Sequence, residues 1–243
     1  MCCQCDPVCP SCQIIRHTCT KDTSRWPRQG WIGGFRGTCA NPHSRPSRPS
    51  TGDALPLPHF FPYMQEEIRE FYVQFACQMG GGIPAYLANT PHVTSEIMPE
   101  TAHELLATGQ FAGIEDPAVN ASFFASLPVS YLSGDDANLV ESRRGGAHGV
   151  LSSAACAVPE LVVALDAALQ NGNPDHAAHL ASMLKEFLSW GGPFPFPVMV
   201  KVAAGLRGVK LGGQSVPLSP GRQRKLDAFR EWFQGWVPAL KRL

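Results

Sequence analysis

The pattern of apolar and polar positions changes near residue 58. Residues 1–58 show no sustained apolar period of either a strand or a helix, and they are rich in Cys, Pro, Ser, Arg and Gly. Such a segment cannot bury enough apolar surface to offset the entropy lost on ordering. We therefore predict a disordered or loosely structured head at 1–58, with a linker near 41–58, and a folded domain at 59–243.

Beyond the head, amphipathic helices alternate with short apolar strands. In residues 65–79 the apolar side chains lie on one face of a predicted helix: Ile68, Phe71, Tyr72, Phe75 and Met79. Four strands are then expected at 85–89, 111–115, 128–134 and 147–152. The segments between them favour helices at 101–109, 119–126 and 136–144, with Pro99 near the first start and Gly109 at its end. This order is typical of a parallel sheet covered by helices.

After Pro159 the pattern becomes entirely helical. Four amphipathic segments, each bounded by Gly or Pro, are expected at 160–172, 174–190, 198–208 and 219–236. Their tryptophans, Trp190, Trp232 and Trp236, are most simply core or interface anchors.

Charge and cysteine content change at the same place as the pattern. The chain has 20 basic and 20 acidic residues, but its first 50 residues hold seven basic and only two acidic ones. Seven of the nine cysteines also lie there, which leaves Cys77 and Cys156 in the apolar remainder. Two isolated thiols fit a reducing compartment, so we expect a cytoplasmic protein. No apolar run of about 18 residues and no signal-peptide core occur, so no membrane association is expected.

The head also contains candidate zinc ligands. Cys9 and Cys12 have zinc-ligand spacing, with Cys5, His17 and Cys19 nearby, and such residues can form a Cys3His site. No second pair follows at the spacing of a regular zinc finger, so unstructured sequence is the simpler interpretation. The density of basic residues is modest, which argues against a nucleic-acid partner. We predict no metal site and no cofactor.

Six segments carry a more specific signal through their sequence and order: IPAYLANTPHVT, FAGIED, YLSGDD, GAHGVLS, PFPFPVMVKVAAGLRG and PLSPGRQRKLDAF. In this order they resemble strands five to eight and the C-terminal helices of the dihydrodipicolinate synthase / N-acetylneuraminate lyase family of class I aldolases. The resemblance implies an α/β fold of the (β/α)8 TIM-barrel type, here an incomplete barrel with C-terminal helices. It also implies a lyase that acts on a small keto acid such as pyruvate.

The position of the family's catalytic lysine is occupied by Glu115. Family members form a Schiff base between pyruvate and that lysine, and a carboxylate cannot form an imine. Ala88 stands before Asn89, where the family has a tyrosine. Val93 stands two residues beyond the strand-five proline, where the family often has an arginine. Nothing in residues 1–60 resembles the family's carboxylate-binding loop. The resemblance therefore implies a member whose Schiff-base activity is absent or impaired.

The resemblance also assigns substrate-binding positions, namely Asn89, Thr94, Gly134, Asp136, Leu151 and Ser152. Glu115 has two interpretations, a general base for a different reaction or a relic of a degenerate site. Asp116 is commonly acidic in the family and is expected to be structural. Tyr86 lies two positions before Ala88, on the same strand face but one layer away. The paired acids Asp135 and Asp136 lack a neighbouring His or Cys, which disfavours a metal there.

Four strands do not close a barrel, because closure of this fold needs eight. The open edges and the apolar interior face would have to be covered. One interpretation is a non-catalytic half-barrel subunit completed by a partner chain or by a second copy in a homo-oligomer. The other is a truncated or misassembled gene product whose head is not native coding sequence. The sequence leaves both open.

Overall fold

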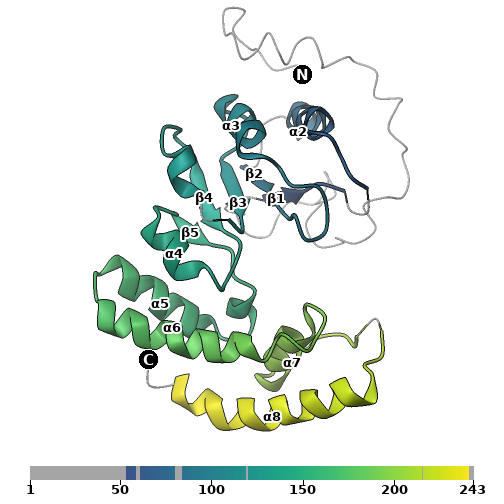
Figure 1. Ribbon diagram of the computed structural model, residues 1–243, viewed down its shortest axis with the longest axis vertical. Helices are drawn as coiled ribbons and strands as arrows, with labels where there is room; N and C mark the ends of the chain where they lie inside the picture. The colour runs from purple at the N-terminus through teal and green to yellow at the C-terminus, as the bar shows by residue number, and fades with distance from the viewer. Residues whose placement is uncertain (1–52, 59–60, 80–83, 119, 215, 241–243) are drawn as a thin grey trace, which may run out of the picture. The chain divides into compact units, whose positions relative to one another are not determined.

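A computed structural model describes residues 53–58, 61–79, 84–118, 120–214 and 216–240 (Figure 1). The described chain forms two compact units, which divide between Leu132 and Ser133. The zinc candidates of the head lie outside the described residues, so that interpretation stays a prediction. None of the described helices is both long and apolar enough to cross a membrane.

The first unit is a parallel sheet with helices between its strands. Its elements in chain order are β1 (Asp53–Pro56), α2 (Gln65–Met79), β2 (Ala85–Ala88), α3 (Pro99–Ala107), β3 (Gly113–Asp116), the 3-10 helix η2 (Ala121–Phe124) and β4 (Ser130–Ser133), whose last residue belongs to the second unit. The strands lie in the order β1-β2-β3-β4, and β2 pairs parallel with both β1 and β3. The predicted βαβα order is thus observed.

Strand β1 was not predicted, because residues 53–56 were assigned to the linker of the head. The segment is only four residues long, it has an aspartate at one end and a proline at the other, and it shows no alternation. Pairing with β2, rather than a pattern in its own residues, makes this segment a strand. All four residues of β1 are in register with β2, from Asp53 opposite Ala85 to Pro56 opposite Ala88. The count of four strands from the sequence was therefore one too low.

Helices α2 and α3 cover the sheet of the first unit through their apolar faces. Ile68 and Tyr72 of α2 are fully buried, and the Tyr72 hydroxyl donates to the Leu55 carbonyl of β1 over 2.9 Å. Helix α3 begins with Pro99 and ends before Gly109, whose φ of +70° suits glycine. The Arg69 guanidinium of α2 pairs with Glu104 of α3 at 2.7 Å.

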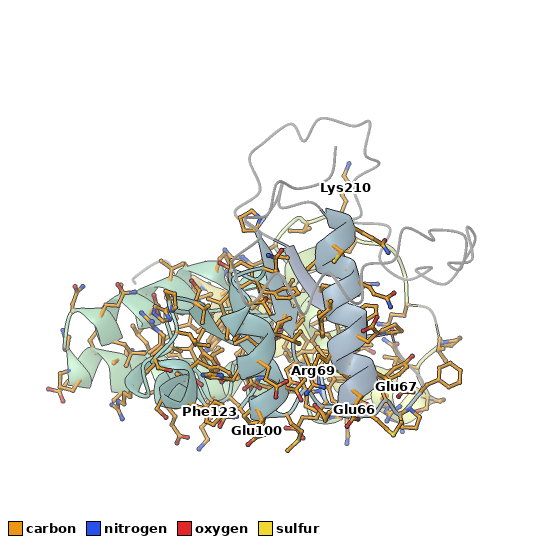
Figure 2. All side chains as sticks on the ribbon, turned by 90° about the horizontal axis from the view of Figure 1, so that it is seen from above. Glu66, Glu67, Arg69, Glu100, Phe123 and Lys210 are labelled. Carbon is orange, nitrogen blue, oxygen red and sulfur yellow. The ribbon has the colours of Figure 1, made fainter. Side chains whose placement is uncertain are left out.

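Acidic side chains gather at the N-terminal ends of these two helices. Figure 2 shows Glu66 and Glu67 at the start of α2 and Glu100 at the start of α3, at the same end of the first unit. Carboxylates at this end of a helix interact favourably with its macrodipole. The two helices therefore run in the same direction, as expected when each connects parallel strands.

The second unit is mainly helical. It contains α4 (Leu139–Arg144), the short strand β5 (Gly149–Val150), the 3-10 helix η3 (Ala154–Cys156), α5 (Pro159–Gln170), α6 (Pro174–Ser189), α7 (Val198–Leu206) and α8 (Pro220–Leu240). The Leu151 N–H, just after β5, donates to the Ser133 carbonyl over 2.8 Å. Helices α5 and α6 pack side by side (Figure 1). The four predicted C-terminal helices are confirmed.

An aromatic cluster forms the core of the second unit. Phe187 of α6 is fully buried, and its ring contacts three rings of α8, with centroid distances of 6.4 Å to Phe229, 5.9 Å to Phe233 and 6.1 Å to Trp236. The Trp236 indole N–H also donates to Glu186 over 3.1 Å. The tryptophans are partly buried against this core, as predicted.

Truncation of Phe187 is expected to destabilise the protein strongly. The Phe187→Ala variant should lose about 3–5 kcal/mol of unfolding free energy, because it leaves a cavity among the aromatic rings. Phe196→Ala is the matched control, since this phenylalanine is 76% exposed, and its effect should stay within about 0.5 kcal/mol. Urea unfolding followed by circular dichroism measures both. Equal losses in the two variants would contradict the proposed core.

Candidate active site

Glu115 lies on one face of the sheet together with small residues. In the register of β2 and β3, Ala88 is opposite Glu115 and Tyr86 is opposite Gly113. Because side chains alternate along a strand, these four residues share a face, while Leu87 and Ile114 point to the other. Ala88 stands directly beside Glu115, so the phenol of the family resemblance is absent from this position.

Gly113 permits a close approach that fixes the layer beneath Glu115. A Cβ atom at this position would lie 2.0 Å from the Ser130 carbonyl oxygen of β4 and 2.8 Å from the Tyr86 ring. No side chain larger than hydrogen fits there. The Tyr86 ring therefore occupies the space over Gly113, one layer below Glu115, as the sequence predicted.

The Glu115 carboxylate is buried without a partner in the described part of the chain. Its side chain is 8% exposed, and no hydrogen bond or ion pair to it is formed among the described residues. No lysine occurs between Lys21 and Lys185, a range that includes every described strand. Burial raises the pKa of Glu115 to about 7, and the neighbouring Asp116 carboxylate adds to this rise.

Asp116 points to the opposite face and is fully engaged. Its carboxylate accepts hydrogen bonds from the Tyr131 hydroxyl at 3.0 Å, the Asn89 and Asn120 side-chain amides at 3.2 and 3.3 Å, and the Ala118 N–H at 3.2 Å. The side chain is 2% exposed. A carboxylate with four donors around it stabilises the loops that follow β2 and β3, which agrees with the structural role expected for it.

Asn89 and Thr94, two of the predicted substrate-binding residues, hold the loop after β2. The Asn89 side-chain oxygen accepts from the Ile97 N–H at 3.0 Å, and its amide group donates to the Ile97 carbonyl at 3.4 Å as well as to Asp116. The Thr94 hydroxyl donates to the Pro58 carbonyl over 2.8 Å. Both side chains have intramolecular partners, and their assignment as substrate-binding residues stays a prediction.

The other predicted positions lie in the second unit. Asp136 accepts hydrogen bonds from the Ser152 hydroxyl, from the Ser153 hydroxyl at 2.7 Å and from the Ala154 N–H at 2.9 Å. It thereby ties the loop that begins at Gly134 to the start of η3. Leu151 is half exposed. Among the described residues no group of His, Cys, Asp or Glu side chains is arranged to hold a metal ion.

A surface pocket of about 350 Å³ lies elsewhere in the second unit. Its walls include Arg143 and Arg144 of α4 and Asn173 before α6. The Arg143 guanidinium already pairs with Asp166 at 2.6 Å. None of the predicted site residues lines this pocket.

The sequence patterns did not identify three hydroxyl groups near the site as functional polar groups. Tyr72 and Tyr131 are fully buried, and the burial of each raises its pKa above the ordinary value of a phenol. In the apolar pattern both count simply as core residues. Thr90 follows Asn89, and its hydroxyl is enclosed without a hydrogen-bond partner. No pattern in the sequence distinguishes this threonine from a surface one.

Known proteins resemble the chain over most of its length. The sequence model of the dihydrodipicolinate synthetase family matches residues 54–234, and the match thus begins within β1. An uncharacterised DapA-like lyase of Halobacterium salinarum is 28% identical over 189 residues, which are 75% of this chain and 62% of the lyase. The chain thus spans about three fifths of the length of that relative.

Solved structures show the same fold. The 4-hydroxy-tetrahydrodipicolinate synthase of Methylacidiphilum fumariolicum superimposes with a TM-score of 0.66 at 26% identity, over 79% of this chain and 67% of the synthase. The dihydrodipicolinate synthase of Acinetobacter baumannii, solved in complex with pyruvate, gives 0.65 at 20% identity, over 76% and 66% of the two chains. The fold is therefore of the (β/α)8 TIM-barrel type, and the described parallel sheet with its helices agrees with it.

The raised pKa of Glu115 predicts how stability depends on pH. In the unfolded chain Glu115 loses its proton near its ordinary pKa of 4.5, and in the folded protein it does so near 7. The folded state therefore binds the proton more tightly, and stability falls as pH rises through this window. The Glu115→Gln variant has no carboxylate to titrate at this position. As pH rises from 4.5 to 7, its unfolding free energy should therefore increase by about 3 kcal/mol relative to that of the unsubstituted protein.

Urea unfolding at several pH values measures this difference. Glu231→Gln, at an exposed position inside α8, is the control for the loss of one surface carboxylate. Parallel stability profiles for Glu115→Gln and the unsubstituted protein would refute the buried, unpaired state of Glu115.

Proposed function

The chain belongs to the dihydrodipicolinate synthetase family, and we propose that it has lost the imine chemistry of the family while keeping part of its ligand-binding scaffold. Glu115 carries this proposal. It occupies the strand position at which the resemblance expects the catalytic lysine, and a carboxylate offers no amine to a keto group.

The surroundings of Glu115 support the loss of imine formation. The absence of lysine from residues 22–184 leaves no amine on any described strand. Ala88, 3% exposed, stands where the resemblance expects a proton-transferring phenol, and Tyr86 belongs to the layer below. Two of the groups that imine chemistry requires are therefore missing from one face of the sheet. This combination favours a relic of the ancestral site over a new general base.

Electrostatics also disfavours a keto acid at this position. The Acinetobacter baumannii synthase was solved with pyruvate, which is an anion at neutral pH. An anion placed about 4 Å from an ionised Glu115 is repelled by about 4 kcal/mol at the effective dielectric constant of about 20 that is typical of proteins. The described strands contain no lysine or arginine whose positive charge could offset that repulsion. The ionised form of Glu115 therefore disfavours pyruvate binding at this position.

We place the protein in the cytoplasm as part of the same proposal. Cys156 is a free thiol, and it is exposed. Exposed free thiols persist in reducing compartments.

Borohydride trapping tests the loss of imine formation. Incubation of the protein with labelled pyruvate and sodium borohydride should leave no covalent label, whereas a catalytically active family member treated in parallel should be labelled on its lysine. Mass spectrometry of the intact chain and its peptides locates any adduct. A pyruvate adduct on a lysine of the chain, such as Lys185 or Lys201, would overturn the proposal.

A second candidate function is that of a non-catalytic subunit, and strand β1 favours it. Within the described residues β1 pairs with β2 alone, which leaves its other edge without a strand. An open edge of a parallel sheet exposes unpaired backbone donors and acceptors and is usually covered. A partner half-barrel or a second copy of the chain would supply that cover.

The mass of the protein in solution tests this second candidate. Size-exclusion chromatography with light scattering should give a multiple of 26.3 kDa, or a stable complex when a full-length relative is added. A well-folded monomer of 26.3 kDa that binds no relative would rule this function out.

A further inference from the structure

The surface pocket of the second unit is lined by two arginines, of which one is held in place and the other is free. Arg143 donates through Nε to Asp166 over 2.6 Å and through a terminal nitrogen to the Ala147 carbonyl. Its side chain is 12% exposed, so these contacts make it a fixed part of the wall. Arg144 lines the same pocket, is exposed, and forms no hydrogen bond or ion pair within the described part of the chain. Its guanidinium donors are therefore available to a ligand.

Asn173 brings a second unused donor to the pocket. Its side-chain oxygen accepts the His176 N–H over 3.2 Å and so caps α6. Because a backbone N–H needs an acceptor, this contact fixes which way the amide is turned and leaves its NH2 group as a donor. That group has no partner among the described residues. The pocket thus combines a charged donor from the end of α4 with a neutral one from the start of α6.

The charges around the pocket favour an anion. Arg143 and Arg144 are the only charged residues among those that line it. Asp166 lies beside Arg143 and is paired with it, so two arginines and one aspartate leave a net charge of +1. Glu141 on α4 and Asp175 on α6 are exposed to solvent and do not line the pocket. The net positive charge is therefore carried by Arg144.

Much of the remaining lining is apolar, which limits the kind of anion. Ala168 and Ala177 belong to the buried core, and Leu169 and Pro174 complete this apolar part. The volume of about 350 Å³ is near the lower end of the range of about 300–1,000 Å³ that is typical of ligand pockets. A carboxylate matches a guanidinium through two parallel N–H···O bonds. The pocket therefore suits a small molecule with a carboxylate at one end and an apolar body.

We propose that this pocket binds a small organic carboxylate with an apolar body, such as benzoate. The Arg144 guanidinium pairs with the carboxylate, the Asn173 amide donates to one of its oxygens, and the apolar body packs against Ala168 and Ala177. The inference goes beyond the proposed function and does not rest on it, because Glu115 and its neighbours do not line this pocket.

Ligand titration of the full chain tests the site. Benzoate is the probe, and binding is followed by saturation-transfer NMR and by calorimetry. Benzoate should bind saturably. Benzamide, which has the ring without the charge, should bind at least about tenfold more weakly. Acetate and inorganic phosphate, which have the charge without a large apolar body, should also bind at least about tenfold more weakly.

Two substitutions test the residues that carry the site. Arg144→Gln removes the charge at an exposed position and should weaken benzoate binding about tenfold. Asn173→Ser keeps an N-cap for α6 but removes the amide donor, and it should weaken binding about threefold. Arg224→Gln, at an exposed arginine of α8, is the matched control and should leave the affinity unchanged. Circular dichroism confirms that each variant is folded before it is titrated.

The inference is overturned by absence of saturable benzoate binding, by equally tight binding of benzamide, acetate or phosphate, or by an unchanged affinity in Arg144→Gln or Asn173→Ser. No lysine lines the pocket, so a ligand bound there cannot give an adduct in the borohydride experiment. A pyruvate adduct therefore refutes the proposed function alone, whereas failed benzoate binding refutes only this site.

Discussion

The hydrogen-bond cluster around Asp116 is the interaction on which the first unit depends. A single buried carboxylate receives donors from the end of β2, from β4 and from the loop that follows β3. An ion removed from water is tolerated only when its lone pairs are satisfied. The cluster therefore fixes the relative positions of the strand ends, and it also fixes the register that brings Glu115 beside Ala88.

Most elements of the fold could be predicted from the sequence because their local patterns agree with their tertiary environment. The helix at Gln65–Met79 has its predicted bounds, and Gly109 ends α3 with a positive φ. Strand β1 could not be predicted, since its order comes from pairing with β2 rather than from its own residues. The segment near 119–126 was expected to be a short helix and forms the 3-10 helix Ala121–Phe124, whose single turn is too short to establish an α-helical period.

The site was less accessible to sequence reasoning than the fold. Motif positions identified Glu115, Ala88 and Asp116, because strand alternation and family spacing are local properties. The partners of Asn89 and Asp136 are not local: Ile97 and Asp116 surround the first, and the serines after β5 surround the second. The partnerless hydroxyl of Thr90 is likewise visible only when its surroundings are known. Spacing in a sequence reports where a side chain lies, but not whether its hydrogen bonds are already used.

Glu115 and Asp116 are adjacent carboxylates with opposite environments, and alternation alone separates them. Asp116 points to the face where tyrosine and asparagine donors converge, so its carboxylate is hydrogen-bonded within the fold. Glu115 points to a face lined by Ala88 and Gly113, where the described residues provide no donor and burial raises its pKa. If Glu115 were a packing residue, selection for stability would favour an apolar side chain or a partner beside it. The unpaired state of Glu115 therefore agrees with a position that is no longer held to the chemistry of the ancestral lysine.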